Sequence, residues 1–392
     1  MTGLRVAVAS SGLGHVNRGV EAWADDLAGE LNARGVDVRL YKGGGVAARP
    51  FERVVPCWQR EGVAARRVLA VVPRRVSWRL GLGSGYAIEQ TTFAWNLVRR
   101  LRREPADVLH VQDPVVAALA QRARRLGLIG TRTVLAHGTE EPVAFLKSID
   151  FLQHLAPWHL EQVRAAGAWT PAWTALPNFV DVTRFAPGRS AALRAELGLP
   201  ADALVVLTAA AIKRGHKRID HLLAEFARLR RDRPELPAYL VVAGGWEAET
   251  DELVAGGTRE LGDRVRFLVR FPRARMADLY RAADAFALAS LFEMMPIALI
   301  EAAASGLPCL VNRHPILDWM TGPGGVSLDM AAPGELAAAL AGVLGDAPRR
   351  QALGAAARRH AVANFSADAV VPRILDYYRF VHESGPRGRA VP

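Results

Sequence analysis

Residues 291–308 read LFEMMPIALIEAAASGLP, and this stretch decides how the rest of the chain is interpreted. Pro296 predicts the first turn of a helix, where its missing backbone donor is not needed, and Gly306 predicts the end of that helix. Glu293 then lies in the loop before the helix, and Glu301 lies about two turns inside it. Carboxylates so placed accept paired hydrogen bonds from the hydroxyls of a sugar or ribose ring. The alternative is a helix-capping acid followed by a surface glutamate.

Short apolar runs alternate with helix-length amphipathic segments on both sides of this stretch. In the first half, we predict strands at residues 4–10, 36–41, 107–112 and 131–138. In the second half, we predict strands at residues 203–211, 238–245, 265–271, 284–290 and 308–312. A final helix is predicted at about residues 367–383. Strands that alternate with helices indicate parallel sheets covered on both faces.

The segment 176–190, LPNFVDVTRFAPGRS, holds two prolines and a glycine with little periodicity, so we interpret it as a linker. The expected division is 1–185, 186–370, and a C-terminal helix and tail over 371–392. A chain of 392 residues exceeds the size at which one core usually stops growing. Two similar α/β halves of the Rossmann type would face one another across a deep interdomain cleft, with ligands at the carboxyl ends of their strands.

The composition is that of a folded globular protein, with 51% hydrophobic and 23% charged residues. No apolar run reaches the roughly 18 residues that a membrane-spanning helix needs. Cys57 and Cys309 fit no paired or metal-binding spacing, which predicts buried thiols in a reducing compartment. The expected location is therefore the cytoplasm.

Much of the formal net charge of +11 is concentrated between residues 49 and 103. This segment, called the basic segment below, carries twelve arginines and only three acids, with Trp58, Trp78 and Trp95 interleaved. Three interpretations stay open. Arginine beside tryptophan suits the anionic inner face of a membrane, the segment recognises an acceptor molecule, or the arginines are abundant solvated residues. No nucleic-acid-binding motif accompanies them, so we expect no nucleic-acid partner.

The sequence around the two glutamates resembles that of the large retaining glycosyltransferase family four, which has the GT-B fold. The resemblance extends over nearly the whole chain. The family signature is a Glu, seven residues, a second Glu, and then Ala-x-Ala-x-Gly-x-Pro. The matching residues are Glu293, Glu301, Ala302, Ala304, Gly306 and Pro308. The resemblance implies that Glu293 binds hydroxyls of the donor sugar and Glu301 the ribose of the nucleotide. It also places Met294 and Met295 beside the sugar, where the family usually has a glycine.

The stretch AAIKRGHKRIDHLL, residues 210–223, supplies cations after a predicted strand. Transfer of a sugar from a nucleotide diphosphate builds negative charge on the departing phosphate, and a fixed cation stabilises that charge. Lys217 matches the lysine of the family. Lys213 is the cation nearest to the position where the family has an arginine. The alternative is a solvated basic turn before a helix.

A glycine-rich turn follows the first predicted strand, and such turns let the backbone approach a diphosphate at a helix start. Gly12 and Gly14 are spaced as in a dinucleotide fingerprint, although Asn17 replaces the third glycine. The following Arg-Gly-x-Glu resembles the N-terminal helix of the glycosyltransferases. We expect Gly14 to contact the phosphates or the acceptor; the alternative is an ordinary tight turn.

Two further residues follow predicted strands. The resemblance places His137 near the reacting sugar, with a satisfied structural histidine as the alternative. It places Arg270 where the backbone of the family frames the nucleotide base. His110, at the end of another strand, is interpreted as structural.

We therefore expect a retaining, metal-independent hexosyltransferase that moves a sugar from a nucleotide diphosphate sugar to a hydroxyl acceptor, which is a natural product, a polysaccharide or a lipid. The sequence contains no Asp-x-Asp and no Cys/His cluster, so no metal or other cofactor is expected. The expected chemistry is same-face attack with the leaving phosphate as the base. The alternatives are a nucleotide-sugar epimerase on the same fold and a nucleotide-sugar-binding protein without catalysis.

Overall fold

The computed structural model describes residues 3–384 except 17, 74, 76 and 78–80. Of the residues named above, Asn17 and Trp78 lie outside the described residues, as do Arg74 and Arg79, two of the twelve arginines of the basic segment. The chain divides into two compact units, which are residues 1–177 with 371–392, and residues 178–370. The division after residue 177 lies within the segment that the sequence marks as a linker.

The first unit is built on a seven-stranded parallel sheet with the order β3-β2-β1-β4-β5-β6-β7. Its strands are β1 (Arg5–Ser10), β2 (Asp37–Lys42), β3 (Glu52–Val54), β4 (Val108–Val111), β5 (Arg132–His137), β6 (Phe151–His154) and β7 (Trp173–Ala175). The four strands predicted in this half are confirmed as β1, β2, β4 and β5. Strands β3, β6 and β7 were not predicted.

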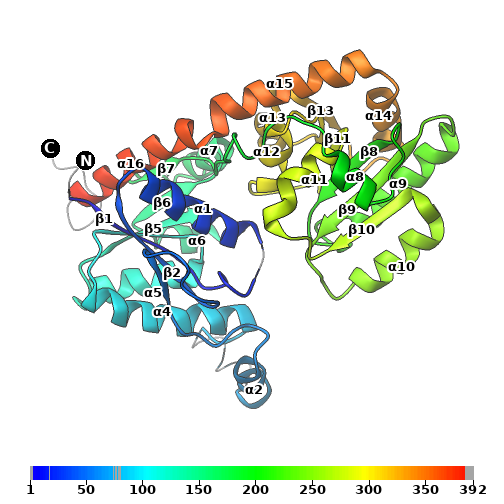
Figure 1. Cartoon of the computed structure of the whole chain (residues 1–392). Coiled ribbons are helices and arrows are strands. Elements are labelled where there is room, and N and C mark those ends of the chain that lie inside the picture. The colour runs from blue at the N-terminus through cyan, green and yellow to red at the C-terminus, as the bar shows by residue number, and fades with distance from the viewer. Residues whose placement is uncertain (1–2, 17, 74, 76, 78–80, 385–392) are drawn as a thin grey trace. The chain divides into compact units, whose positions relative to one another are not determined.

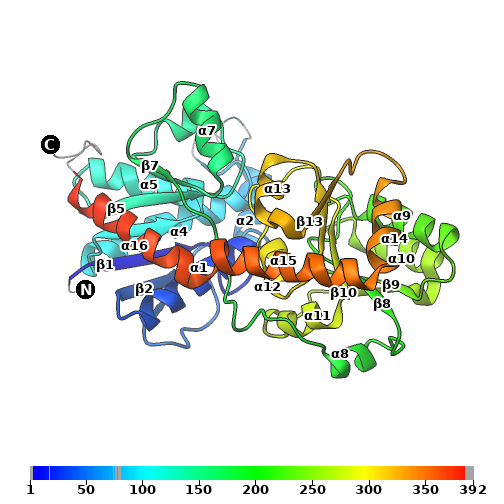
Figure 2. The same ribbon diagram turned by 90° about the horizontal axis from the view of Figure 1, so that it is seen from above.

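Helices cover both faces of this sheet. They are α1 (Gly19–Ala33), α2 (Val63–Val71), α4 (Gly85–Arg103), α5 (Pro114–Arg125), α6 (Val143–Leu146), α7 (Pro157–Ala165) and α16 (Ala367–Glu383). Helices α4 and α5 pack side by side (Figure 1). Helix α16, drawn in red in Figure 2, packs on the sheet because Tyr378 reaches His110 of β4 and Tyr377 donates to the carbonyl of Leu152 in β6.

The second unit holds a six-stranded parallel sheet with the order β10-β9-β8-β11-β12-β13. Its strands are β8 (Leu204–Ala209), β9 (Ala238–Gly244), β10 (Val265–Val269), β11 (Ala285–Leu288), β12 (Cys309–Asn312) and β13 (Gly325–Leu328). The five strands predicted in this half are confirmed, and β13 was not predicted. The helices are α8 (Ala191–Glu196), α9 (Ile219–Asp232), α10 (Thr250–Leu261), α11 (Met276–Ala282), α12 (Ile297–Ala304), α13 (Pro315–Thr321), α14 (Glu335–Leu344) and α15 (Ala347–Phe365), with short 3₁₀ turns η1 (Gly262–Arg264), η2 (Arg273–Arg275) and η3 (Gly322–Gly324).

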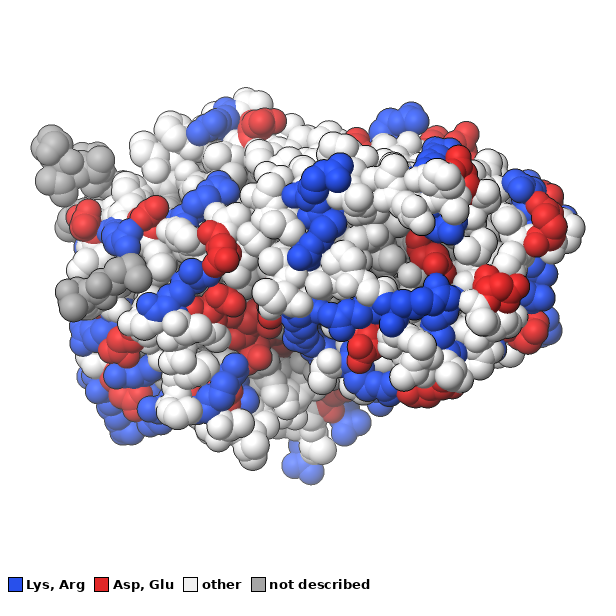
Figure 3. Space-filling model, turned by 45° about the horizontal axis from the view of Figure 1, so that its top comes forward, with Lys and Arg blue, Asp and Glu red and all other residues white. Residues whose placement is uncertain are grey.

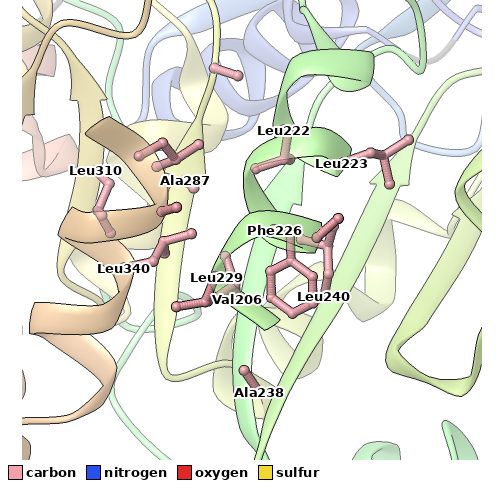
Figure 4. Packing of buried hydrophobic residues seen from close by; sticks show 14 of the residues in the cluster. Val206, Leu222, Leu223, Phe226, Leu229, Ala238, Leu240, Ala287, Leu310 and Leu340 are labelled. Carbon is pink, nitrogen blue, oxygen red and sulfur yellow. The ribbon is translucent and has the colours of Figure 1, made fainter. Parts of the chain in front are cut away.

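The core of the second unit forms where α9 lies on the sheet (Figure 4). Leu222, Phe226 and Leu229 recur at the helical period of α9 and pack towards Val206 of β8 and Leu240 of β9. All five side chains are fully buried. Burial of each such side chain contributes roughly 1.5–3 kcal/mol. The core therefore fixes the sheet from which the loops of the second unit project.

Each sheet has one point at which the strand order reverses. In the first unit it lies between β1 and β4, and in the second unit between β8 and β11. Ligands of open parallel sheets bind at the carboxyl ends of the strands beside this point. The topology therefore directs attention to the loops after β1 and β4, and to the loops after β8 and β11.

The basic segment contributes β3, α2 and α4 to the first unit. Part of its charge is neutralised locally, because Arg49 pairs with Asp25 and Glu52, and Arg60 pairs with Glu89. On the face of the whole chain drawn in Figure 3, both basic and acidic side chains are present. Across the described residues, no helix is both long and apolar enough to span a bilayer.

Candidate active site

The loops after β8 and β11 bring Lys217 and Glu293 together, although they are 76 positions apart in the chain. The Lys217 ammonium donates to one oxygen of Glu293 at 2.5 Å. The ring Nε2 of His216 lies 3.2 Å from the other oxygen. Glu293 itself is buried. The structure therefore forms one cation–carboxylate–imidazole cluster at the strand-order reversal of the second unit.

The electrostatic balance keeps Glu293 ionised. Burial alone would raise the pKa of this carboxyl, because it disfavours the charged form. The hydrogen bond from His216 and the charge of Lys217 outweigh burial, so the pKa lies below its ordinary value. Glu293 is thus an acceptor of hydrogen bonds at neutral pH.

Lys213 lies at the beginning of the same loop and is half-buried. Its carbonyl accepts a hydrogen bond from the amide of Ile219, at the start of α9. In the part of the chain that the structure describes, its ammonium has no ion-pair partner. Neighbouring Arg214 is engaged elsewhere, since its guanidinium pairs with Glu252. Lys213 is therefore available to a phosphate.

Glu301 lies in α12, in the helix that the motif predicted, and is buried. One of its oxygens accepts from Arg273 of η2 at 2.5 Å, and the other accepts from the hydroxyl of Tyr280 in α11 at 2.8 Å. Burial, followed by the charge of Glu301, raises the pKa of Tyr280 well above its usual range, so this hydroxyl remains a donor. The two partners hold the carboxylate in one orientation.

Three further predicted donor contacts belong to the second unit. Arg270 follows β10 with a left-handed backbone, φ 58°, and its amide donates to the carbonyl of Gly244 at 2.7 Å. Met294 is half-buried, whereas Met295 is buried and its sulfur lies 3.1 Å from the amide of Asn178. The roles of Arg270, Met294 and Met295 in ligand binding stay predictions.

In the first unit, Gly14 is needed by the backbone. It has φ 97°, and a Cβ added there would lie 2.1 Å from the carbonyl oxygen of Gly44. The turn after β1 and the loop after β2 therefore approach one another closely. Whether Gly14 contacts phosphates or an acceptor stays a prediction.

A carboxylate network supports this turn. Glu89 of α4 is fully buried and accepts from His15 at 2.9 Å and from the side chain of Arg60 at 2.5 Å. Burial would raise the pKa of Glu89, but the hydrogen bonds of His15 and Arg60 hold it at about 2. The network ties α4 to the glycine turn.

His137 ends β5 opposite His154, which ends β6, and their Nδ1 atoms are 3.3 Å apart. Burial lowers the pKa of His137 to about 4 and that of His154 to about 3, so both rings are neutral at pH 7. His110 is fully buried, with its Nδ1 2.6 Å from the hydroxyl of Tyr378. A function for His137 near a sugar stays a prediction.

The structure thus unites Lys217 with Glu293, and it surrounds both predicted glutamates with partners that the sequence did not identify. These missed residues are His216, Arg273 and Tyr280. His216 directly precedes Lys217, and this adjacency was the only signal for it. Among the described residues, no group of three or more His, Cys, Asp or Glu is arranged to hold a metal ion. Metal independence stays a prediction.

Two family models match the chain. The model for Glycosyltransferase Family 4 matches residues 17–180, and the model for Glycosyl transferases group 1 matches residues 190–360. The two matches follow the two units of the structure closely.

Similar curated proteins carry the name D-inositol 3-phosphate glycosyltransferase. The protein of this name from Thermobispora bispora is 36% identical over 229 residues, which are 53% of this chain and 51% of that protein. One from Catenulispora acidiphila is 34% identical over 219 residues, covering 54% and 52% respectively. The match thus spans about half the length of these relatives.

Solved structures share the fold over nearly the whole chain. Sucrose-phosphate synthase from Thermosynechococcus elongatus has a TM-score of 0.77 at 20% identity, covering 96% of this chain and 98% of that one. HepE of Anabaena, in complex with UDP and glucose, has a TM-score of 0.71 at 15% identity, covering 95% and 99%. With its two parallel-sheet α/β units and both family matches, the chain belongs to the family-four, group 1 glycosyltransferases of the GT-B fold.

Proposed function

We propose that this chain transfers a sugar from a nucleotide diphosphate sugar to a hydroxyl acceptor, with retention of anomeric configuration and without a metal ion. One observation carries the proposal, which is the contact of Lys217 and His216 with buried Glu293 at the carboxyl ends of β8 and β11. The structure of HepE in complex with UDP and glucose supports a nucleotide-sugar donor.

The cluster offers both charges that the reaction needs. When the bond between the anomeric carbon and the phosphate oxygen breaks, negative charge builds on the diphosphate, and in this proposal the ammonium of Lys217 offsets it. Lys213 adds a second cation from the same loop. Glu293 accepts hydrogen bonds from hydroxyls of the sugar and so fixes the ring.

The acceptor oxygen forms its new bond to the anomeric carbon on the face that the diphosphate leaves. Its proton passes to an oxygen of the departing phosphate. No protein carboxylate is consumed in this step, which agrees with a Glu293 that is already bonded to two side chains.

Glu301 is suited to the ribose of the nucleotide. Arg273 and Tyr280 each bond one oxygen of Glu301 and so fix the orientation of the carboxylate. In that orientation its oxygens accept the two ribose hydroxyls as a pair. Arg270, whose guanidinium lies over the ring of Trp246, is the residue that we propose to border the nucleotide base.

The decisive experiment measures diphosphate release from a panel of UDP- and GDP-sugars, with and without EDTA. We expect one donor to be hydrolysed slowly, EDTA to have no effect, and Lys217→Ala to lower kcat about 10²–10³-fold. Lys147→Ala, which removes an exposed lysine of the first unit, is the matched control. NMR of the product formed with an added alcohol reports the anomeric configuration.

The outcomes separate the competing functions. Tight nucleotide binding without release from any donor would favour a binding protein without catalysis. Appearance of a second nucleotide sugar without diphosphate release would favour an epimerase. Wild-type turnover in Lys217→Ala would overturn the proposed mechanism.

A peripheral membrane contact is a second proposal, favoured by α2 of the basic segment. Val63, Leu69 and Val71 are exposed on this helix, together with Arg66 and Arg67. Such a helix presents apolar and cationic groups to an anionic surface. Flotation with anionic vesicles at low salt tests it, and the double variant Leu69→Ser, Val71→Ser is expected to lose the association. Wild-type protein that stays at the bottom of the gradient would refute it.

A further inference from the structure

A pocket lies in the first unit between α4 and the segment that follows β3. Its volume is about 470 Å³, which falls in the range of about 300–1,000 Å³ typical of small-molecule sites. It is called the Trp58–Trp95 pocket here, and its lining includes Pro56, Cys57, Trp58, Leu82, Trp95 and Arg99. No residue of the donor cluster belongs to it.

The lining is largely apolar, and the polar groups of Thr92 and Asn96 in it are already occupied. Trp58 and Trp95 are 47% and 61% exposed, so their rings are accessible to a ligand at this lining. The hydroxyl of Thr92 accepts from the amide of Trp58 at 3.0 Å and donates to a backbone carbonyl. The amide of Asn96 donates to the carbonyl of Pro56 at 2.8 Å. The pocket therefore offers ring faces more than free hydrogen-bonding groups, which favours a flat apolar ligand over a sugar.

Arg99 adds a positive charge at this lining. Its guanidinium is exposed and donates to the side-chain oxygen of Asn96 at 3.1 Å. In the described part of the chain it has no ion-pair partner. The two buried acids of the basic segment already have partners, because Glu52 pairs with Arg49 and Glu89 pairs with Arg60. A negative charge on the ligand would therefore find an unpaired cation.

Cys57 connects the pocket with the glycine turn. Its sulfur is 3.4 Å from the carbonyl of Gly43 and 3.9 Å from the carbonyl of Ser11. These two residues directly follow β2 and β1, at the carboxyl ends where ligands of such sheets bind. Burial raises the pKa of the thiol to about 12, so Cys57 adds a neutral wall. The pocket thus adjoins the functional edge of the first sheet.

We propose that the Trp58–Trp95 pocket binds the apolar ring system of the hydroxyl acceptor and that Arg99 pairs with an acidic group on the same molecule. The identity of the ligand as the acceptor rests on the proposed transfer reaction. The chemistry of the ligand, a flat ring system that carries a negative charge, follows from the lining alone.

The test is a fluorescence titration of the full chain with anilinonaphthalene sulfonate, which is aromatic and anionic. We expect saturable binding that Trp95→Ala weakens at least about tenfold. The matched control is Trp169→Ala, since Trp169 is 42% exposed in the same unit but outside the pocket. It is expected to leave the dissociation constant unchanged. Circular dichroism and the melting temperature verify that each variant is folded.

A second pair of variants tests the charge. Arg99→Gln is expected to weaken binding of the sulfonate about two- to fivefold at low salt. Arg103→Gln removes an exposed arginine one turn further along α4 and is expected to have no effect. With the uncharged probe N-phenyl-1-naphthylamine, Arg99→Gln is expected to bind as the wild type does. An equal loss in Arg99→Gln and Arg103→Gln would overturn the assigned pairing.

Competition tests whether a ring compound that carries a hydroxyl occupies the same pocket. The planar phenol 4-methylumbelliferone is expected to displace the probe, whereas UDP is not. Equal effects of Trp95→Ala and Trp169→Ala would overturn the pocket. If Trp95→Ala binds the probe as the wild type does but no longer floats with vesicles, this surface is a membrane contact instead. Failure of every donor to release its diphosphate would overturn the transfer reaction, and the titration would still decide the pocket.

Discussion

The two units hold buried carboxylates in different ways. In the first unit, Glu89 is fully buried and accepts from Ser11, His15 and both the amide and the guanidinium of Arg60. In the second unit, Glu293 accepts from Lys217 and from His216, whose side chain is 43% exposed. A carboxylate that is enclosed and whose hydrogen-bonding positions are all used, such as Glu89, stabilises the fold. A carboxylate whose partners are exposed to solvent, such as Glu293, can exchange those partners for a ligand. Burial and ion pairing alone therefore do not mark a binding residue.

The largest expected effect tests this difference directly. Glu89→Ala leaves Arg60 and His15 without their partner, and the free energy of unfolding is expected to fall by about 3–5 kcal/mol. Glu293→Ala is expected to cost only about 1–2 kcal/mol but to abolish turnover. Urea unfolding measures the free energies, and diphosphate release measures turnover.

Glu61→Ala is the control for Glu89→Ala, because Glu61 belongs to the same basic segment and is exposed. It is expected to change the free energy of unfolding by less than about 0.5 kcal/mol. Equal losses in Glu89→Ala and Glu293→Ala would show that the two carboxylates do not differ as proposed.

The glycine turn gives the next effect. Gly14→Ala brings a methyl group to 2.1 Å from the carbonyl of Gly44 at a positive φ. We expect a loss of about 2–3 kcal/mol, from a strained backbone and a forced separation of the two loops. Gly35→Ala has a similar φ of 76° with nothing within 4 Å, so it is expected to cost about 1 kcal/mol. Thermal unfolding of both variants isolates the clash, and equal melting temperatures would contradict it.

Much of the fold could be predicted from the sequence. The helix expected between Pro296 and Gly306 is α12, and the helix expected at 367–383 is α16. The long apolar strands of both sheets were predicted because a run of apolar residues between two helical patterns is visible in the local sequence. Strands β3 and β7 have three residues each, too few for a periodic pattern to appear.

The candidate site could be predicted only in part. Glu293, Glu301 and Lys217 belong to sequence motifs, so the sequence alone indicates them. The partnership of Tyr280 with Glu301 depends on how α11 packs against α12, which no local pattern specifies. In the same way, Glu89 counted as one of three acids in a basic segment until the fold placed it against His15.

The buried histidines of the first unit predict a pH dependence. Burial lowers the pKa of His154 and His137 below the value of 6.5 in the unfolded chain, so the unfolded state binds more protons. Their stabilising contribution is complete above pH 6.5 and is lost as the pH falls towards 4. The free energy of unfolding is expected to fall between pH 6.5 and 4.5, by about 1.4 kcal/mol per pH unit for each such histidine.

The variant His154→Asn isolates one of these groups. Asparagine keeps a polar atom near the position of Nδ1 but does not titrate in this range. The slope of the free energy of unfolding against pH is therefore expected to decrease by the contribution of one histidine. His382→Asn, at an exposed position of α16, is expected to leave the slope unchanged. Above pH 4.5 the lowered pKa of Glu89 does not contribute, because that carboxyl is ionised in both states. Identical slopes in wild type and His154→Asn would refute the assignment.

The smallest effect concerns Tyr280, whose hydroxyl orients Glu301. Tyr280→Phe keeps the buried ring and removes one hydrogen bond, which costs about 1 kcal/mol. If Glu301 binds the ribose, the loosened carboxylate raises KM for the donor about three- to tenfold with kcat nearly unchanged. Tyr377→Phe removes the hydroxyl of a buried tyrosine in the first unit, which donates to a backbone carbonyl. It is expected to lower stability by a similar amount and to leave KM unchanged. If both variants lose stability to a similar extent but only Tyr280→Phe raises KM, the hydroxyl of Tyr280 orients a binding carboxylate in addition to supporting the fold.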